Sequence, residues 1–158
     1  MCIRDRPELA ELRLANIGFV FQAYNLIPVL SALENVAFVM QLQGVPANER
    51  NERAREILAD VGLGDKEKSR PGQLSGGQQQ RVAVARAIVS NPSLVLADEP
   101  TANLDSTTSG SLLELMQRMN EERGVSFVFS THDELVMRFA RGAIKLLDGK
   151  ILRETSGD

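Results

Sequence analysis

The pattern of apolar positions divides the chain into three zones. In the first, residues 7–22, the β-branched and aromatic run Ile17–Phe21 predicts a strand that ends at the polar residue Gln22. In the second, residues 23–72, apolar residues recur at helical spacing. The third, residues 74–158, alternates helical periodicity with short apolar runs.

The second zone predicts two helices. Ser31 and Glu34 fit a capping box, in which each side chain binds the backbone amide of the other residue, so the first helix begins there. The second helix has a densely charged face, on which Glu49 and Arg53 are spaced for an ion pair. We interpret this face as solvated rather than as a docking surface. Its opposite face carries Ala54, Ile57, Leu58 and Val61.

The third zone predicts an alternating architecture. Its elements are a helix, a strand, a helix, a strand and a hairpin, at residues 78–89, 94–97, 107–122, 125–130 and 143–153. Asp148-Gly149 is a strong signal for the two-residue turn of that hairpin. Apolar strands separated by helices favour an α/β fold with a mostly parallel, covered sheet. We expect one domain over residues 1–158, with a helical subdomain at 23–72 inserted between sheet parts at 7–22 and 74–158.

Composition narrows the possible environments and partners. The net charge of −3 and the isoelectric point near 5.3 argue against a nucleic-acid partner. The single cysteine, Cys2, is interpreted as an inert residue of a protein from a reducing compartment. No apolar run approaches the roughly 20 residues of a spanning helix, so we expect a soluble chain whose membrane link comes through a partner.

Two acids follow the apolar strand at 94–97. Asp98 at the carboxyl end of such a strand is well placed to hold Mg²⁺, which binds one or two carboxylates plus phosphate oxygens and water. Glu99 is suited to act as a base for an attacking water. Gln22 also leaves a strand end, where its amide can reach a metal or a water. The alternatives are a strand that simply reaches solvent and a glutamine that caps a loop.

Two further sites carry polar chemistry. Ser75 predicts an N-cap, and Gly76 and Gly77 let a phosphate approach the free amides of the helix that follows. An ordinary capped helix is the alternative. His132, the only histidine, ends the second apolar strand, where it can hydrogen-bond a phosphate or serve a structural role. Arg81 and Arg86 are interpreted as structural or interface residues.

The order of these sites resembles the ABC-type ATPase family, whose Q-loop, signature, Walker B motif, D-loop and H-loop follow in this sequence. The matching residues are Gln22, Ser75, Asp98-Glu99, Asn103-Leu104-Asp105 and His132. Residues 96–105 match closely. Residues 19–22, 25–28 and 32–36 resemble a narrower group, the subunits that serve lipoprotein-release and macrolide-export transporters. The resemblance covers residues 7–158 and implies part of an ABC-type P-loop ATPase domain.

The resemblance also implies roles for the acidic side of the site. Asp98 would hold Mg²⁺ through water, and Gln22 would complete that shell while sensing a membrane partner. Glu99 would polarise the attacking water, and His132 would contact the γ-phosphate of ATP. The implied cofactors are ATP and Mg²⁺, and the implied reaction is ATP hydrolysis coupled to transport.

The signature side implies protein partners. Its residues would bind the ATP held mainly by a second ATP-binding subunit in a head-to-tail dimer, with Asp105 at the interface. Residues 23–33 would face an integral membrane permease subunit, which places the chain on the inner, cytoplasmic face of the cell membrane. The residues implied to contact nucleotide are Ser75, Gly76, Gly77 and Gln78.

The sequence departs from the family at its beginning. No glycine lies in the expected Gly-rich loop ending in Gly-Lys-Ser/Thr, and the aromatic residue that stacks on adenine is also missing. Residues 1–6 do not resemble the expected segment, so we expect a truncated boundary and doubtful ATP hydrolysis by the isolated chain. A non-catalytic, signature-side partner of a complete subunit is the alternative. A DNA-repair or chromosome role is disfavoured, because only 53 positions without heptads separate Gln22 from Ser75.

Overall fold

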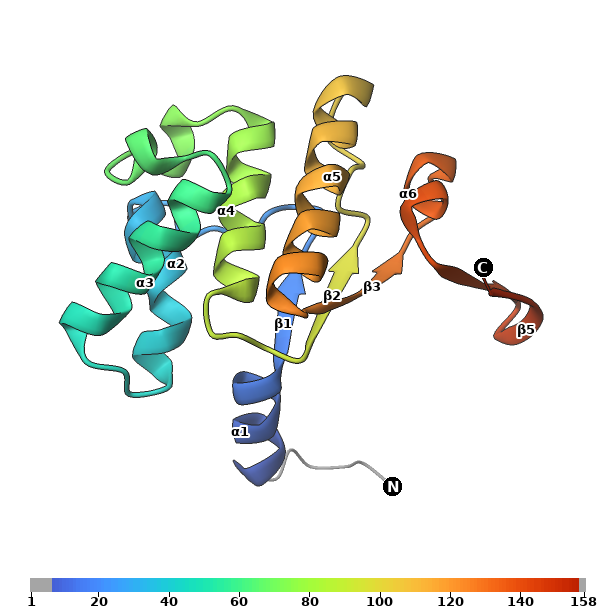
Figure 1. Cartoon of the computed structure of the whole chain (residues 1–158), viewed down its shortest axis with the longest axis horizontal. Helices are drawn as coiled ribbons and strands as arrows, with labels where there is room; N and C mark the ends of the chain where they lie inside the picture. The colour runs from blue at the N-terminus through green and yellow to red at the C-terminus, as the bar shows by residue number, and fades with distance from the viewer. Residues whose placement is uncertain (1–6, 157–158) are drawn as a thin grey trace.

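The computed structural model describes residues 7–156, and a parallel sheet of three strands lies at its centre (Figure 1). Cys2 and the rest of the segment 1–6 lie outside the described residues. Both strand pairings are parallel, as the sequence predicts. The carboxyl ends of parallel strands meet at one edge of a sheet, and the polar residues of the predicted site follow these ends. The strands, in spatial order, are β1 (Ile17–Val20), β2 (Leu94–Asp98) and β3 (Ser126–Ser130).

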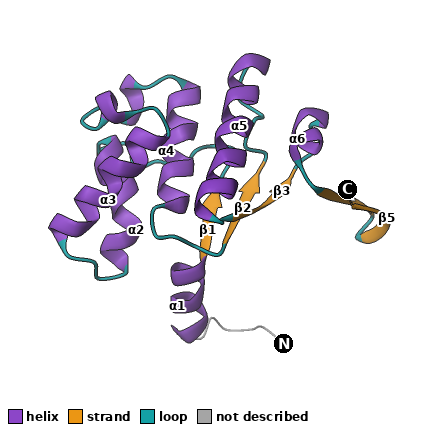
Figure 2. Cartoon of the chain, viewed as in Figure 1, coloured by secondary structure: helices purple, strands orange, loops and turns teal. Residues whose placement is uncertain are grey.

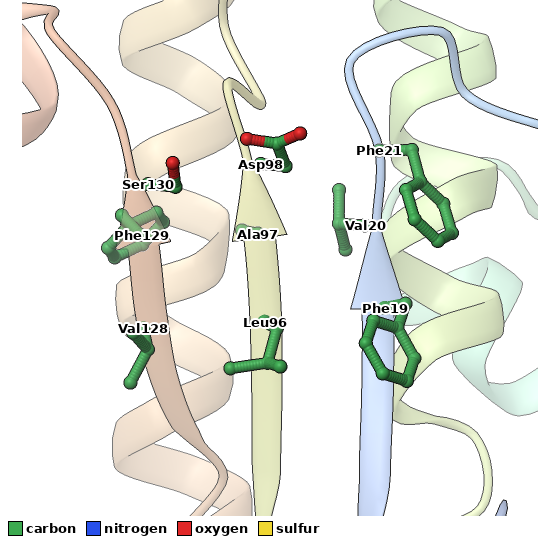
Figure 3. A pocket seen from close by; sticks show the side chains of 9 residues that line it. All are labelled: Phe19, Val20, Phe21, Leu96, Ala97, Asp98, Val128, Phe129 and Ser130. Carbon is green, nitrogen blue, oxygen red and sulfur yellow. The ribbon is translucent and has the colours of Figure 1, made fainter. Parts of the chain in front are cut away.

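Helices α4 (Gly76–Ile88) and α5 (Ser106–Arg123) lie on one face of this sheet, behind the strands in Figure 3. Val20, Val95 and Ala97 point into that side and are fully or almost fully buried. Alternate residues point to the opposite face, where Phe19 is 39% and Val128 53% exposed. The sequence predicted a covered sheet, but the described residues cover one face, because strand side chains alternate and the helices lie on one side.

Two helices between β1 and α4 form the predicted helical part. They are α2 (Ala32–Leu42) and α3 (Ala47–Asp60), which pack against each other and against α4. Two short 3-10 turns, η1 (Gly64–Lys66) and η2 (Pro71–Gln73), lead from α3 to α4. The buried side chains of α2 and α3 join those of the sheet in one continuous apolar core. Figure 2 shows this all-helical region beside the strands.

The local signals read from the sequence are present in these helices. The Ser31 hydroxyl accepts from the Glu34 amide at 3.2 Å, and the Glu34 carboxylate accepts from the Ser31 amide at 2.7 Å, so the capping box is confirmed. On α3, Arg53 pairs with Glu49 at 2.5 Å, and both side chains are about half exposed. The charged face is therefore solvated in this chain, while Ala54, Ile57 and Leu58 are buried.

Two helices were not predicted. Segment 7–16 forms α1 (Pro7–Asn16), whose Leu12 remains exposed and whose Leu14 carbonyl accepts a 2.8 Å hydrogen bond from the Gln43 side chain. Helix α6 (Glu134–Phe139) is short and begins at Asp133, which caps it. Neither segment has a broad apolar stripe, which is the signal that sequence periodicity detects.

The hairpin of β4 (Gly142–Leu147) and β5 (Lys150–Ser156) forms a separate antiparallel sheet that extends away from the strands of the parallel sheet (Figure 1). Asp148 and Gly149 both adopt positive φ angles at its turn, as the sequence predicts. Several apolar side chains of the hairpin are more than half exposed: Ile144, Leu146, Leu147, Ile151 and Leu152. Among residues 7–156, no helix is both long and apolar enough to cross a membrane.

Candidate functional site

The site lies at the carboxyl edge of the parallel sheet. Asp98 is the last residue of β2 and stands level with Ser130, the last residue of β3. Its exposed side chain sits at the upper end of a hollow of about 360 Å³ on the open face of the sheet (Figure 3). Gln22 follows β1, and its carbonyl accepts a 2.9 Å hydrogen bond from the Asn103 side chain. The predicted Q-loop and D-loop residues therefore meet within this chain.

Glu99 turns away from β2 in an unusual conformation. Its φ of +43° lies in the left-handed region, which costs a non-glycine residue about 1 kcal/mol or more. Its amide donates to the Ser130 carbonyl at 2.9 Å, so the turn is bonded to the end of β3. A strained residue that its neighbours hold in place is common at functional sites.

The Glu99 carboxylate binds the loop that follows β3. One oxygen lies 2.6 Å from Nδ1 of His132 and accepts from the His132 amide at 3.3 Å. The other accepts from the Thr131 hydroxyl at 3.1 Å. The sequence proposed Glu99 and His132 as separate participants, and the structure places them in direct contact. The sequence analysis did not single out Thr131, whose only signal in the sequence is its position next to His132.

The surroundings of Glu99 favour its ionised form. Burial acts to raise the pKa of Glu99, but hydrogen bonds from His132 and Thr131 and the charge of His132 together lower the pKa below its usual value. The Glu99 side chain is only 20% exposed, whereas that of His132 is 89% exposed. The pair therefore presents an exposed imidazole beside a shielded, ionised carboxylate that can accept a hydrogen bond from water.

Helix α4 begins with a second capping box. The Ser75 hydroxyl accepts from the Gln78 amide at 3.3 Å, and the Gln78 side chain accepts from the Ser75 amide at 2.9 Å. The predicted N-cap is therefore confirmed. The amides of Gly76 and Gly77 lie in the first helical turn, where the helix dipole favours a negative charge.

The two glycines of this turn have a packing reason that the sequence did not reveal. A Cβ atom on Gly77 would lie 2.5 Å from the methyl group of Thr108 in α5. A Cβ atom on Gly76 would lie 2.9 Å from the hydroxyl of Tyr24. Both distances are shorter than van der Waals contact, so a side chain at position 77 would push Thr108 aside and one at position 76 would displace the Tyr24 hydroxyl.

Asp105 has a structural role in addition to the interface role that the sequence suggested. It caps α5, because its carboxylate accepts from the Thr108 amide at 3.0 Å and from the Thr108 hydroxyl at 2.6 Å. The hydrogen bond from the Thr108 hydroxyl contributes most and that from the Thr108 amide comes next, and together they lower the pKa of Asp105 below its usual value. In residues 7–156, no hydrogen bond joins Ser75 to Glu99 or to His132. The turn at residues 75–78 and the Glu99–His132 pair therefore do not share a hydrogen-bond network.

A magnesium–nucleotide complex fits the donors at this edge better than a free metal ion does. No cluster of three or more His, Cys, Asp or Glu side chains in the described part of the chain could hold a metal. The Glu99 carboxylate is engaged by Thr131 and His132, which leaves Asp98 as the carboxylate at the strand end. One carboxylate is the usual protein contribution when phosphate oxygens complete the magnesium shell.

Comparisons with known proteins agree with the order of these motifs. The family model described as ABC transporter matches residues 4–102. A macrolide export ATP-binding/permease protein, MacB of Syntrophobacter fumaroxidans, is 50% identical over 92% of this chain and 21% of its own length. The lipoprotein-releasing system ATP-binding protein LolD of Geobacter metallireducens is 44% identical over 92% of this chain and 65% of its own. The narrower resemblance is thus confirmed.

A solved structure shows the same fold. The ATP-binding cassette MJ0796, in a dimeric post-hydrolysis state bound to ADP and Pi, superposes with a TM-score of 0.85 at 45% identity. The match covers 98% of this chain and 68% of that one. The chain therefore spans about two thirds of the length of the single-cassette relatives that it matches. Because the family model covers more than half of the chain and the motifs occupy the expected sheet edge, the chain belongs to the ABC transporter family.

Proposed function

We propose that the chain is part of the ATP-binding subunit of an ABC transporter, which couples ATP binding and hydrolysis to the export or release of a substrate. The observation that carries this proposal is the contact of Glu99 with His132 beside Asp98. The names of the relatives MacB and LolD, which refer to macrolide export and lipoprotein release, support export or release as the task. Substrate choice belongs to a separate integral membrane permease subunit.

The polar residues at the carboxyl edge of the parallel sheet, called the acidic edge below, have different roles in the proposed reaction. Asp98 would hold Mg²⁺ together with Gln22, and the bound Mg²⁺–ATP supplies the phosphoryl group for transfer to water. Glu99, ionised and shielded, orients the attacking water and accepts its proton. His132 hydrogen-bonds the γ-phosphate with the imidazole nitrogen that does not face Glu99.

The signature residues act on a second nucleotide. Ser75, Gly76, Gly77 and Gln78 open a helix whose amides favour phosphate. By the family resemblance, these residues serve a nucleotide held mainly by a second ATP-binding subunit. The dimeric state of the cassette MJ0796 bound to ADP and Pi supports a pair of subunits, and the family resemblance implies that the pair is head-to-tail. Such a pair works at the inner face of the cell membrane, beside its permease, and needs no nucleic acid.

A second candidate function is a non-catalytic partner that offers only its signature side. The sequence contains no Gly-rich loop ending in Gly-Lys-Ser/Thr, so this chain has no lysine to neutralise the β- and γ-phosphates. The signature turn is nevertheless fully formed, with its capping box intact. We infer that hydrolysis at the acidic edge requires a phosphate-binding loop in addition to the residues present here.

Mixing this chain with a complete subunit such as LolD tests both functions. A signature side that works in trans changes the ATPase rate of the mixture, and Ser75→Ala abolishes the change. The matched control is Ser31→Ala, which removes the capping box of α2 and costs a similar stability of about 1 kcal/mol. An unchanged ATPase rate with the wild-type chain would contradict trans action. An equal effect of both variants would trace the change to stability.

A test of the acidic edge follows from the same logic. When a Gly-Lys-Ser/Thr loop segment of a complete relative is joined ahead of residue 7, we expect measurable ATP hydrolysis. Glu99→Gln should then reduce the rate by about a hundredfold or more, since it removes the base and leaves the shape. Hydrolysis that survives this substitution would refute the assignment of Glu99.

A further inference from the structure

Arg86, in the last turn of α4, reaches across to the segment that follows β1. One guanidinium nitrogen donates to the Asn25 carbonyl at 2.5 Å, and another donates to the Tyr24 carbonyl at 2.9 Å. Burial lowers the pKa of Arg86, but a guanidinium stays charged at physiological pH. The two donors of one planar group therefore hold two successive carbonyls that lie more than 60 positions away in the sequence.

The backbone that Arg86 holds is strained. Tyr24 and Asn25 have φ angles of 60° and 48°, both in the left-handed region. A non-glycine residue in this region costs roughly 1–2 kcal/mol. Hydrogen bonds from a charged donor are among the stronger ones in proteins, so those from Arg86 can offset this cost and select the strained turn.

Other side chains fasten the same segment on either side of this turn. Asn103 donates to the Gln22 carbonyl at its start. Asn35, fully buried in α2, accepts from the Ile27 amide at 2.8 Å and donates to the carbonyls of Ile27 and Leu30 near its end. The Tyr24 hydroxyl lies against the first turn of α4, close to Gly76. The middle of the segment is thus fixed to the signature helix, which carries both Arg86 and Gly76.

We propose that Arg86 is a positioning residue that locks the segment 22–31 onto helix α4, so that the segment and the signature turn at residues 75–78 move as one body. A partner that displaces the segment then displaces the signature turn by the same motion. The use of this motion for coupling to a membrane partner rests on the proposed function. The lock itself is a property of this chain and can be tested without nucleotide or partner.

The chain supplies its own probe of the lock. Tyr24 is the only tyrosine, and the chain has no tryptophan, so tyrosine emission and a fluorotyrosine label each report on this one position. The test compares Arg86→Gln and Arg86→Lys in the 158-residue chain. The matched control is Arg81→Gln on the same helix, because Arg81 donates a 3.0 Å hydrogen bond to the Val61 carbonyl, outside the segment.

We expect Arg86→Gln to move the fluorine resonance of Tyr24 and to raise the quenching of tyrosine emission by acrylamide. The unlocked population should increase about tenfold or more, as expected for the loss of hydrogen bonds from a charged donor. Arg86→Lys should restore the signal in part, since its ammonium keeps the charge but not the planar fork. Arg81→Gln should leave the Tyr24 signal unchanged.

Two results would overturn the lock. The first is a wild-type Tyr24 signal in Arg86→Gln while circular dichroism shows a folded chain. The second is an equal disturbance by Arg81→Gln, which would reduce the role of Arg86 to general stability. If Arg86→Gln does not fold, folded Arg86→Lys decides the question: a disturbed Tyr24 signal supports the lock, and a wild-type signal refutes it.

Discussion

At the scale of the residue, Glu99 combines backbone strain with a carboxylate held by two neighbours. Hydrogen bonds from His132 and Thr131 outweigh its burial, so the pKa of Glu99 is lower in the folded chain than the usual 4.5. Because the pKa is lowered by folding, the ionised carboxylate stabilises the folded chain at pH values above the usual pKa of 4.5. This stabilisation is lost as the pH falls through the folded pKa, because the unfolded chain then binds the proton more strongly.

This residue predicts a pH dependence. The unfolding free energy of the wild type should exceed that of Glu99→Gln at pH values above 4.5, and the gap should shrink as the pH is lowered further. Glutamine keeps the shape and the φ angle, so backbone strain cancels in the comparison. Denaturant unfolding of both chains over a pH series measures the gap. A gap that stays constant across the series would contradict the assignment.

Individual residues were also the scale at which sequence reasoning worked best. Ser31, Ser75 and the turn at Asp148-Gly149 were found because caps and turns depend on a few neighbouring residues. The contact of Glu99 with His132 was not predicted, since it depends on a positive φ that a glutamate rarely adopts. The hydrogen bonds of Arg86 could not be predicted from the sequence either, because their acceptors are backbone carbonyls far away in the sequence.

At the scale of the element, helices α4 and α5 contact each other through a glycine. Gly77→Ala should destabilise the chain by about 1–3 kcal/mol, because its Cβ would meet the Thr108 methyl group at 2.5 Å. Gly110→Ala in α5 is the matched control, since nothing lies within 4 Å of its added Cβ. It should stabilise the chain by roughly 0.5–1 kcal/mol through helix propensity. Thermal unfolding that shifts both variants in the same direction would refute this packing argument.

The strands support a comparison between the two faces of the sheet. Val95→Thr, which places a hydroxyl among fully buried apolar groups, should cost about 1–3 kcal/mol in denaturant unfolding. Val128→Thr, on the open face, should change stability by no more than about 0.5 kcal/mol. It should also weaken the binding of an apolar dye to the hollow beside Asp98. Equal costs for the two variants would mean that both faces are covered in solution.

Elements also show where periodicity fails. Helices α4 and α5 were predicted with boundaries within two residues, and α2 and α3 were predicted without full boundaries, because each carries an apolar stripe or a cap. Helix α1 was missed, since Leu12 is exposed and a long-range hydrogen bond from Gln43 contributes to holding it. The one-sided cover of the sheet was missed as well. Apolar residues at every strand position predict burial on both faces, and sequence alone does not tell which segments provide it.

At the scale of the whole molecule, the order of the motifs carried most of the functional information. No single motif was specific, but five motifs in one order placed the chain in a family that the comparisons confirmed. The fold then follows from the family, and the parallel order β1-β2-β3 agrees with it. The contacts between loops, such as that of Glu99 with His132, were left for the structure to show.

The inserted helical part separates strands that must pair, and this has a consequence for the kinetics of folding. Ile17 of β1 pairs with Leu94 of β2, 77 positions later, whereas α2 and α3 contact each other across one short turn. Long loops close slowly and local contacts form early. Pulsed hydrogen exchange during refolding should therefore find amides of α2 and α3 protected before those of β1. A chain emerging from the ribosome would likewise leave the edge of β1 that pairs with β2 without its partner until β2 has been made.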